Sequence, residues 1–247
     1  MAVVGNTQAR TPLTIGWDAV KANAKPALIL QGVMLALLIG YYTSPPLAHA
    51  LETLAQLREQ YGLGFVLVSA AIAGAIVPEL FLIVFFQHGK PRRANLRNLA
   101  FTIPTCAMDG VLVDGMYRLN AFWFGDVITL PVLAAKVCVD MFGYNPFLAA
   151  PLEVLIYEWK NEGFSWASVR RALTWAHYKD KIVPTLLATW AVWMPLMAVI
   201  YALPLALQFP LFSVALTFWV LLLTYMTNRF AGKIEADRPL ALATVEQ

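Results

Sequence analysis

Charged residues are scarce in this chain of 247 residues. Asp, Glu, Lys and Arg together make up 13% of it, whereas hydrophobic residues make up 60%. A soluble domain of ordinary composition has about 25% charged residues. The scarcity of charge excludes a soluble globular protein, and a formal net charge of +3 is too small to suggest nucleic acid as a partner. The composition predicts an all-α fold, a polytopic transmembrane helix bundle with the lipid bilayer as its main partner.

Cysteine, histidine and known catalytic motifs are also sparse. The two cysteines, Cys106 and Cys138, both lie in hydrophobic runs, so we expect neither a disulfide framework nor a paired-cysteine metal site. The three histidines have no second ligand at helical spacing. The chain contains no HExxH, GxSxG, phosphate-binding loop or nucleotide-binding glycine fingerprint. These absences predict a protein with no metal, no cofactor and no enzymatic activity.

Hydrophobic runs divide the chain into about six expected spans. They cover residues 27–43, 62–86, 95–122, 127–156, 183–203 and 209–229. At roughly 20 residues per span they form a single transmembrane domain, 27–230. An N-terminal polar or interfacial segment, 1–26, precedes it. A polar tail, 231–247, follows it, and there we expect Pro239 to prevent a long helix.

Two further stretches are amphipathic but too short or too polar to cross a membrane. Leucines recur at helical spacing among charged residues in 51–61. The stretch 164–178 keeps its apolar residues on one stripe, with Ser165 as a helix cap and Trp166 and Trp175 as interfacial anchors. We expect the first to be a helix at the membrane surface or an extension of the next span, and the second to be an interfacial helix.

Small residues and prolines mark where helices should pack. The second run contains Ala70-Ala71-Ile72-Ala73-Gly74-Ala75, which would let another helix approach closely. The fourth run carries Pro131, Pro146 and Pro151. Each proline leaves a backbone carbonyl that only a neighbouring helix or water can satisfy. We therefore expect the fourth helix to be kinked and buried.

Basic residues gather in alternate loops. They precede the first span, join the second to the third, join the fourth to the fifth, and follow the sixth: Arg10, Lys21, Lys25, Lys90, Arg92, Arg93, Arg97, Lys160, Arg170, Arg171, Lys179, Lys181, Arg229, Lys233 and Arg238. The other loops contain only Arg58 and Arg118. This pattern predicts six spans with both termini on the cytoplasmic or matrix side of a bacterial or mitochondrial inner membrane.

Ionisable residues inside the hydrophobic runs are the main functional signal. The predicted intramembrane polar cluster consists of Glu79, Asp109, Asp114, Lys136, Asp140 and Glu153. An isolated charge at the bilayer centre costs about 2.5–3.5 kcal/mol on insertion scales, so these groups should face the bundle interior or water. Lys136 and Asp140 are four residues apart and can pair on one helix face. The cluster fits either an acid-lined path or a clasp that holds kinked helices together.

Several motifs resemble those of a known family. The chain contains Gly110-Val111, followed by Met116-Tyr117; then Lys136, Asp140-Met141 and Pro146; then Trp193, Pro195, Pro204 and Trp219. These positions resemble the Gly-Pro to Trp-Tyr, Lys to Asp-Gln to Pro, and Trp-Pro to Pro to Trp patterns of the Mpv-type, or 22-kDa peroxisomal membrane protein, family and its prokaryotic relatives. The resemblance covers about residues 62–225. Val111, Met116, Met141 and Gln208 depart from it, where the family has proline, tryptophan, glutamine and arginine.

The resemblance implies a small integral membrane protein that acts as a weakly selective channel or metabolite conduit. An acid-lined interior would permit that function. The alternative is a non-catalytic accessory or structural subunit that packs in a larger membrane complex, with other proteins or a second copy of the chain as partners. A wet path from Glu79 to Asp114 would favour the conduit, and a dry, closed core would favour the subunit.

Overall fold

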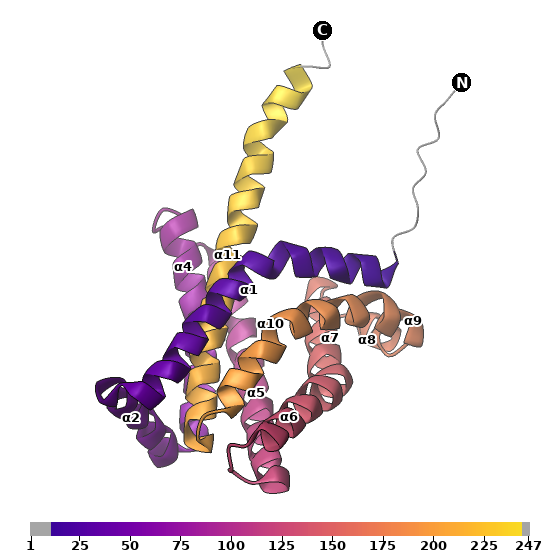
Figure 1. Ribbon diagram of the computed structural model, residues 1–247. Coiled ribbons are helices and arrows are strands. Elements are labelled where there is room, and N and C mark those ends of the chain that lie inside the picture. The colour runs from indigo at the N-terminus through magenta and orange to yellow at the C-terminus, as the bar shows by residue number, and fades with distance from the viewer. Residues whose placement is uncertain (1–10, 244–247) are drawn as a thin grey trace. The chain divides into compact units, whose positions relative to one another are not determined.

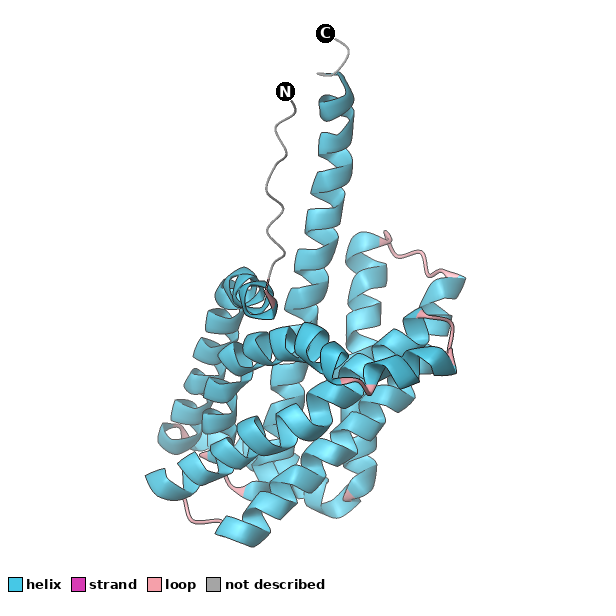
Figure 2. Cartoon of the chain, turned by 90° about the vertical axis from the view of Figure 1, so that its right-hand side faces the viewer, coloured by secondary structure: helices cyan, strands magenta, loops and turns pink. Residues whose placement is uncertain are grey.

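The computed structural model describes residues 11–243, and every regular element in that range is a helix (Figures 1 and 2). The all-α fold expected from composition is confirmed. Five stretches are long and apolar enough to cross a membrane: Pro12–Thr43, Leu63–Phe86, Arg93–Phe124, Trp175–Tyr201 and Leu205–Tyr225. The protein is a multi-pass helical membrane protein.

The chain divides into two compact units. The first unit, Met1–Leu35 with Phe122–Ala202, contains the beginning of α1 (Pro12–Thr43), α6 (Leu130–Cys138), η2 (Val139–Ala149), α7 (Ala150–Asn161), α8 (Trp166–Ala172), α9 (Trp175–His177), η3 (Tyr178–Ile182) and α10 (Val183–Tyr201). The second unit, Ala36–Ala121 with Leu203–Gln247, contains the end of α1, α2 (Pro45–Tyr61), α3 (Leu63–Ala71), η1 (Ile72–Ile76), α4 (Val77–Phe86), α5 (Arg93–Phe124) and α11 (Leu205–Ala243). The η segments are π-helical, with hydrogen bonds that reach back five residues.

Each π segment ends two residues before a proline, namely Pro78, Pro151 or Pro184. The residue just before each proline donates its N–H to the carbonyl five residues earlier: Val77 to Ile72, Ala150 to Asn145 and Val183 to Tyr178. A proline ring clashes with the carbonyl four residues before it, and a wider turn relieves that clash. The positions of the prolines therefore account for the positions of the π segments.

The fourth expected span, 127–156, is helical from Leu130 onward, because α6, η2 and α7 follow one another without a break. It is not among the five most apolar stretches. Its polar residues Lys136, Asp140 and Asn145 lie within it and lower its hydropathy. Pro146 lies inside the 11-residue π segment η2. The expected burial of this helix is only partial, because Phe142 and Phe147 of η2 are 50% and 79% exposed.

Two expected boundaries are wrong. First, α1 runs unbroken through Pro26, although a surface helix and a separate span were expected there. The residues around Pro26 are alanine, leucine and lysine, which favour helix strongly enough to tolerate one lost hydrogen bond. Second, α11 continues to Ala243, so 231–243 is not a non-helical tail. Ala, Leu, Glu and Lys dominate that segment, and they outweigh the effect of Pro239. Residues 244–247 lie outside the described part.

Other sequence-based expectations are confirmed. The stretch 51–61 belongs to α2, and α8 begins after Ser165, whose side chain accepts a hydrogen bond from the Ala167 N–H. The single helix expected over 164–178 is wrong, because α8 ends at Ala172 and α9 begins at Trp175 after a new cap, Thr174. In the first unit Ala150, Ile182 and Leu186 form a buried cluster that fixes α7 against η3 and α10. In the second unit the start of α11 is buried, and Phe212 packs edge-on against Tyr117 of α5, a residue of the family-like motif, with ring centroids 6.2 Å apart.

Candidate functional site

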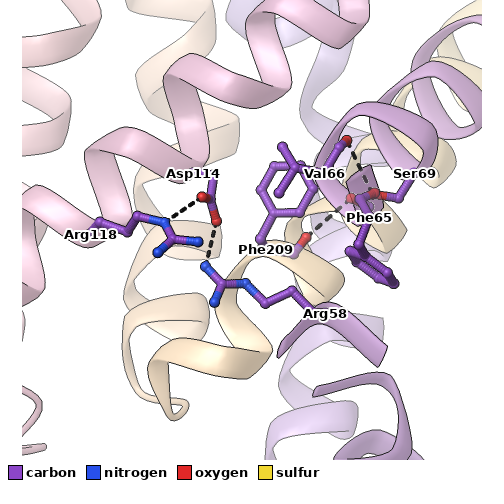
Figure 3. A network of polar contacts seen from close by, with 8 residues as sticks. Arg58, Phe65, Val66, Ser69, Asp114, Arg118 and Phe209 are labelled. Atoms are coloured by element: carbon purple, nitrogen blue, oxygen red, sulfur yellow. Dashed lines mark hydrogen bonds and ion pairs between the residues drawn. The ribbon is translucent and has the colours of Figure 1, made fainter. Parts of the chain in front are cut away.

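Asp114 of α5 is the centre of an ion-pair network in the second unit. Its Oδ1 accepts a hydrogen bond from Nη2 of Arg58, on α2, and its Oδ2 accepts one from Nε of Arg118, one turn further along α5. Both distances are 2.6 Å, and Figure 3 shows the carboxylate between the two guanidinium groups. The Arg58 side chain is only 8% exposed, whereas that of Arg118 is 54% exposed. The buried carboxylate is thus neutralised by its own chain.

Arg58 and Arg118 are the two basic residues of the loops that lack a cluster of positive charge. The structure gives both of them the same partner. The spacing of Asp114 and Arg118, four residues apart on a helix, is a signal for pairing that sequence reasoning could have used. The contact with Arg58 carries no such signal, because the two residues are 56 positions apart.

Glu79 of α4 is held in a different way. It is buried, and its Oε1 and Oε2 accept hydrogen bonds from the side-chain amides of Asn95 and Asn98, each at 2.6 Å. The Asn95 Oδ1 in turn accepts the N–H of Arg92 just before α5. Glu79 therefore fixes the beginning of α5 against α4. The two asparagines were not predicted as site residues.

The expected close approach at the small residues of the second run is confirmed. A Cβ added at Gly110 of α5 would lie 2.5 Å from the Ala70 Cβ, and one added at Gly74 would lie 2.8 Å from the Cys106 Sγ. Both helices thus use positions four residues apart, which is the spacing of a small-residue packing motif. Asp109, next to Gly110, is half-buried on the same helix.

Asp140 lies in η2 of the first unit and is buried. Its Oδ2 accepts a hydrogen bond of 2.7 Å from the hydroxyl of Tyr201 at the end of α10. Lys136 is also buried, one turn before Asp140, and its pairing with Asp140 stays a prediction. Glu153, in α7, is exposed.

Two backbone carbonyls of η2 accept hydrogen bonds from aromatic side chains. In the π register Pro146 would donate to the Met141 carbonyl, and Pro151 would donate to the Pro146 carbonyl, but proline has no N–H. The Trp190 Nε1 donates to the Met141 carbonyl at 2.7 Å, and the Tyr178 hydroxyl donates to the Pro146 carbonyl at 3.1 Å. The expectation that neighbouring helices satisfy the carbonyls freed by proline is confirmed.

Tyr178, Trp190 and Tyr201 are spaced by 12 and 11 residues along η3 and α10, about three helical turns each. One face of this helical stretch therefore donates three hydrogen bonds to η2. The same principle operates at Pro195 of α10, which frees the carbonyl of Ala191. The Gln31 side-chain amide of α1 donates to the carbonyls of Ala191 at 3.1 Å and Val192 at 3.0 Å.

The side-chain amide of Asn145 in η2 differs from the carbonyls that accept hydrogen bonds from aromatic side chains. Asn145 follows Asp140 by five residues, and its side-chain Oδ1 is buried without a hydrogen-bond partner among the described residues. The amide oxygen of Asn145 is therefore a buried acceptor that this fold leaves unused, in the same segment as the Asp140 carboxylate.

The predicted polar cluster is distributed over both units. Glu79, Asp109 and Asp114 belong to the second unit, and Lys136, Asp140 and Glu153 to the first. Glu79 and Asp114 have separate sets of partners, so they do not form one acidic lining. Within the described residues, no group of three His, Cys, Asp or Glu side chains could hold a metal ion.

The remaining family-like positions lie in α10, in α11 or between these two helices. Trp193 of α10 and Trp219 of α11 are half-buried, and Pro204 precedes α11, where its carbonyl accepts the Leu207 N–H at 2.8 Å. Comparisons with protein-family models, with curated proteins and with solved structures found no match. The fold and the geometry of η2 are therefore the basis on which a function can be proposed: this is a multi-pass helical membrane protein whose π segment η2 buries the polar side chains of Asp140 and Asn145.

Proposed function

We propose that the protein is a weakly selective membrane conduit for small polar solutes, and that η2 supplies the groups that contact the solute. The observation that carries this proposal is the buried, unpartnered Oδ1 of Asn145, five residues after the buried carboxylate of Asp140 in one π segment. π segments occur frequently at functional sites.

An unsatisfied polar group inside a membrane costs several kcal/mol. Several other buried groups are paired, since Trp190 and Tyr178 bind the carbonyls freed by proline and two arginines bind Asp114. Among the described residues, Gln87 Oε1 and Gln208 Oε1 are further buried acceptors without a donor, and both lie outside η2. Asn145 Oδ1 differs from them because it lies in the same π segment as the buried Asp140 carboxylate. A passing solute with its own hydrogen-bond donor or positive charge would bind to these two acceptors.

The chemistry of η2 favours cations or hydrogen-bond donors over anions. A carboxylate and an amide oxygen are both acceptors, and oxygen groups of this kind replace part of the hydration shell of a cation in known pores. The resemblance to the Mpv-type family, whose motif matches Asp140 and Pro146, supports the same proposal.

Flux through liposomes tests the conduit. We expect wild-type protein to pass small cations, and Asn145→Leu to lower that flux at least tenfold. The melting temperature of Asn145→Leu should stay the same or rise, because the substitution removes an unsatisfied buried polar atom. Trp190→Phe is the matched control: it removes a structural hydrogen bond of η2, so it should lower the melting temperature and leave the Asn145 oxygen in place.

The alternative function is a non-catalytic subunit of a larger membrane complex. It is favoured by the Arg58–Asp114–Arg118 network and by the Glu79 contacts, which commit Asp114 and Glu79 of the second unit to packing. Well-folded wild-type protein that passes no solute would reject the conduit and favour the subunit. Unchanged flux in Asn145→Leu would reject the role given to η2.

A further inference from the structure

The segment between the expected spans 127–156 and 183–203 exposes large hydrophobic side chains. Phe164, Trp166, Leu173 and Trp175 are between 51% and 77% exposed, although each would gain from burial. They belong to α8 and its flanks, and Trp175 is the first residue of the candidate span Trp175–Tyr201. Tryptophan in such a place is typical of the boundary between lipid headgroups and acyl chains.

Basic side chains alternate with these hydrophobic groups. Arg170, Arg171, Lys179 and Lys181 are all exposed, and Arg171 is paired with Glu162. The range 158–181 has five Lys or Arg residues and three Asp or Glu residues, which gives a formal charge of +2. The surface is therefore both aromatic and positively charged.

One lysine of this surface is held above an aromatic pair. Trp175 stacks on Tyr178 with ring centroids 5.2 Å apart and an interplanar angle of 13°. The Lys179 Nζ lies 5.3 Å from the centroid of the Trp175 ring. This cation–π contact orients the ammonium group before any ligand binds.

A second lysine–tryptophan pair lies at the same end of α10. In α1 the Lys21 Nζ is 5.9 Å from the centroid of the Trp17 ring, and Trp17 is 58% exposed. Gly16, next to Trp17, packs on the start of α10, since an added Cβ would lie 3.1 Å from the Pro184 Cα. Lys179 and Lys181 immediately precede α10, and Figure 1 shows the beginning of α1 passing the start of that helix.

We infer that this end of the first unit binds anionic phospholipid headgroups. Trp17 and Trp175 would lie at the headgroup level, and Lys21, Lys179, Lys181 and Arg170 would contact lipid phosphates. Positive charge complements an anionic leaflet, and each Lys or Arg near such a surface contributes about 1 kcal/mol. The exposed tryptophans select a lipid surface as the partner, because they need an apolar layer beside the charged one.

Native mass spectrometry of the full chain in detergent tests this inference. The purified protein is mixed with equal amounts of phosphatidylglycerol and phosphatidylcholine, and the ratio of the two bound lipids is measured. We expect wild type to favour phosphatidylglycerol. The substitutions Lys179→Gln and Lys181→Gln should each reduce the preference for phosphatidylglycerol about fivefold, because a contribution of about 1 kcal/mol per lysine corresponds to about a fivefold change in the binding ratio.

The matched control removes the same charge elsewhere. Lys90→Gln with Arg93→Gln neutralises two exposed residues next to the turn between α4 and α5, and we expect it to keep the wild-type preference. Trp175→Leu keeps both lysines but removes the aromatic support of Lys179, so it should reduce the preference about two- to fivefold. Circular dichroism confirms that each variant retains its helices.

Three results would overturn the inference. Equal binding of the two lipids by wild type would show that the surface does not recognise negative charge. An equal loss in the lysine variant and in the control would show that net charge alone sets the preference. Retention of the full preference in the folded lysine variant would place lipid recognition elsewhere.

Discussion

Buried ionisable residues in this protein differ in the number and kind of their partners. Asp114 has two guanidinium groups, Glu79 has two amides, and Asp140 has one phenol hydroxyl. A carboxylate between two arginines is committed to structure, because any solute that competes for it must displace a charged partner. Asp140 is less committed, and its neighbour Asn145 offers a further oxygen.

Removing the Asp114 charge should destabilise the protein strongly. In Asp114→Asn the buried guanidinium of Arg58 loses its counter-ion, and breaking such a pair costs about 3–5 kcal/mol. Arg118→Gln removes the exposed partner and should cost less than about 1 kcal/mol. Unfolding in detergent measures both, and equal melting temperatures for the two variants would contradict the assignment of Arg58 as the buried partner.

At the scale of helices, prolines and aromatic donors form a consistent pattern. Prolines widen the helix turns before them, and the resulting free carbonyls of η2 and α10 accept hydrogen bonds from Tyr178, Trp190 and Gln31. The packing of α10 on η2 therefore depends on hydrogen bonds that a regular α-helix would not offer.

The partnership of Pro151 and Tyr178 can be tested with a double-mutant cycle. Tyr178→Phe should cost about 1–3 kcal/mol, because it leaves the Pro146 carbonyl buried without its donor. In a Pro151→Ala background residue 151 has its own N–H for that carbonyl, so the effect of Tyr178→Phe should shrink by about 1 kcal/mol. Melting curves of the four proteins give the coupling. Strictly additive effects would show that Pro151 is not what frees the carbonyl.

At the scale of the whole molecule, the number of crossings depends on one stretch. Five helical stretches are apolar enough to span, and the continuous helix α6–η2–α7 is the remaining candidate. If it also crosses, the chain has six spans and both termini share one side, as the basic loops predict. If it does not cross, the termini lie on opposite sides.

Cysteine labelling distinguishes the two topologies. We expect single cysteines at Gly5 and Thr244, in a background without Cys106 and Cys138, to react with a membrane-impermeant reagent from the same side. Cysteines placed in the turns at Gly89 and Gly125 serve as controls for opposite sides, because α5 lies between them. Labelling of the two termini from opposite sides would exclude a crossing by α6–η2–α7.

The sequence by itself determined the fold class, the positions of most helices and the prolines that disturb the fourth span. These properties are local, since hydropathy and helix propensity depend on neighbours within a few turns. The structure decided which groups meet. Arg58 and Asp114 are 56 residues apart, Tyr201 and Asp140 are 61 apart, and Trp190 and Met141 are 49 apart. Local patterns contain no information at that separation, so whether a buried charge is committed to packing or left for a solute became visible only once the helices were packed.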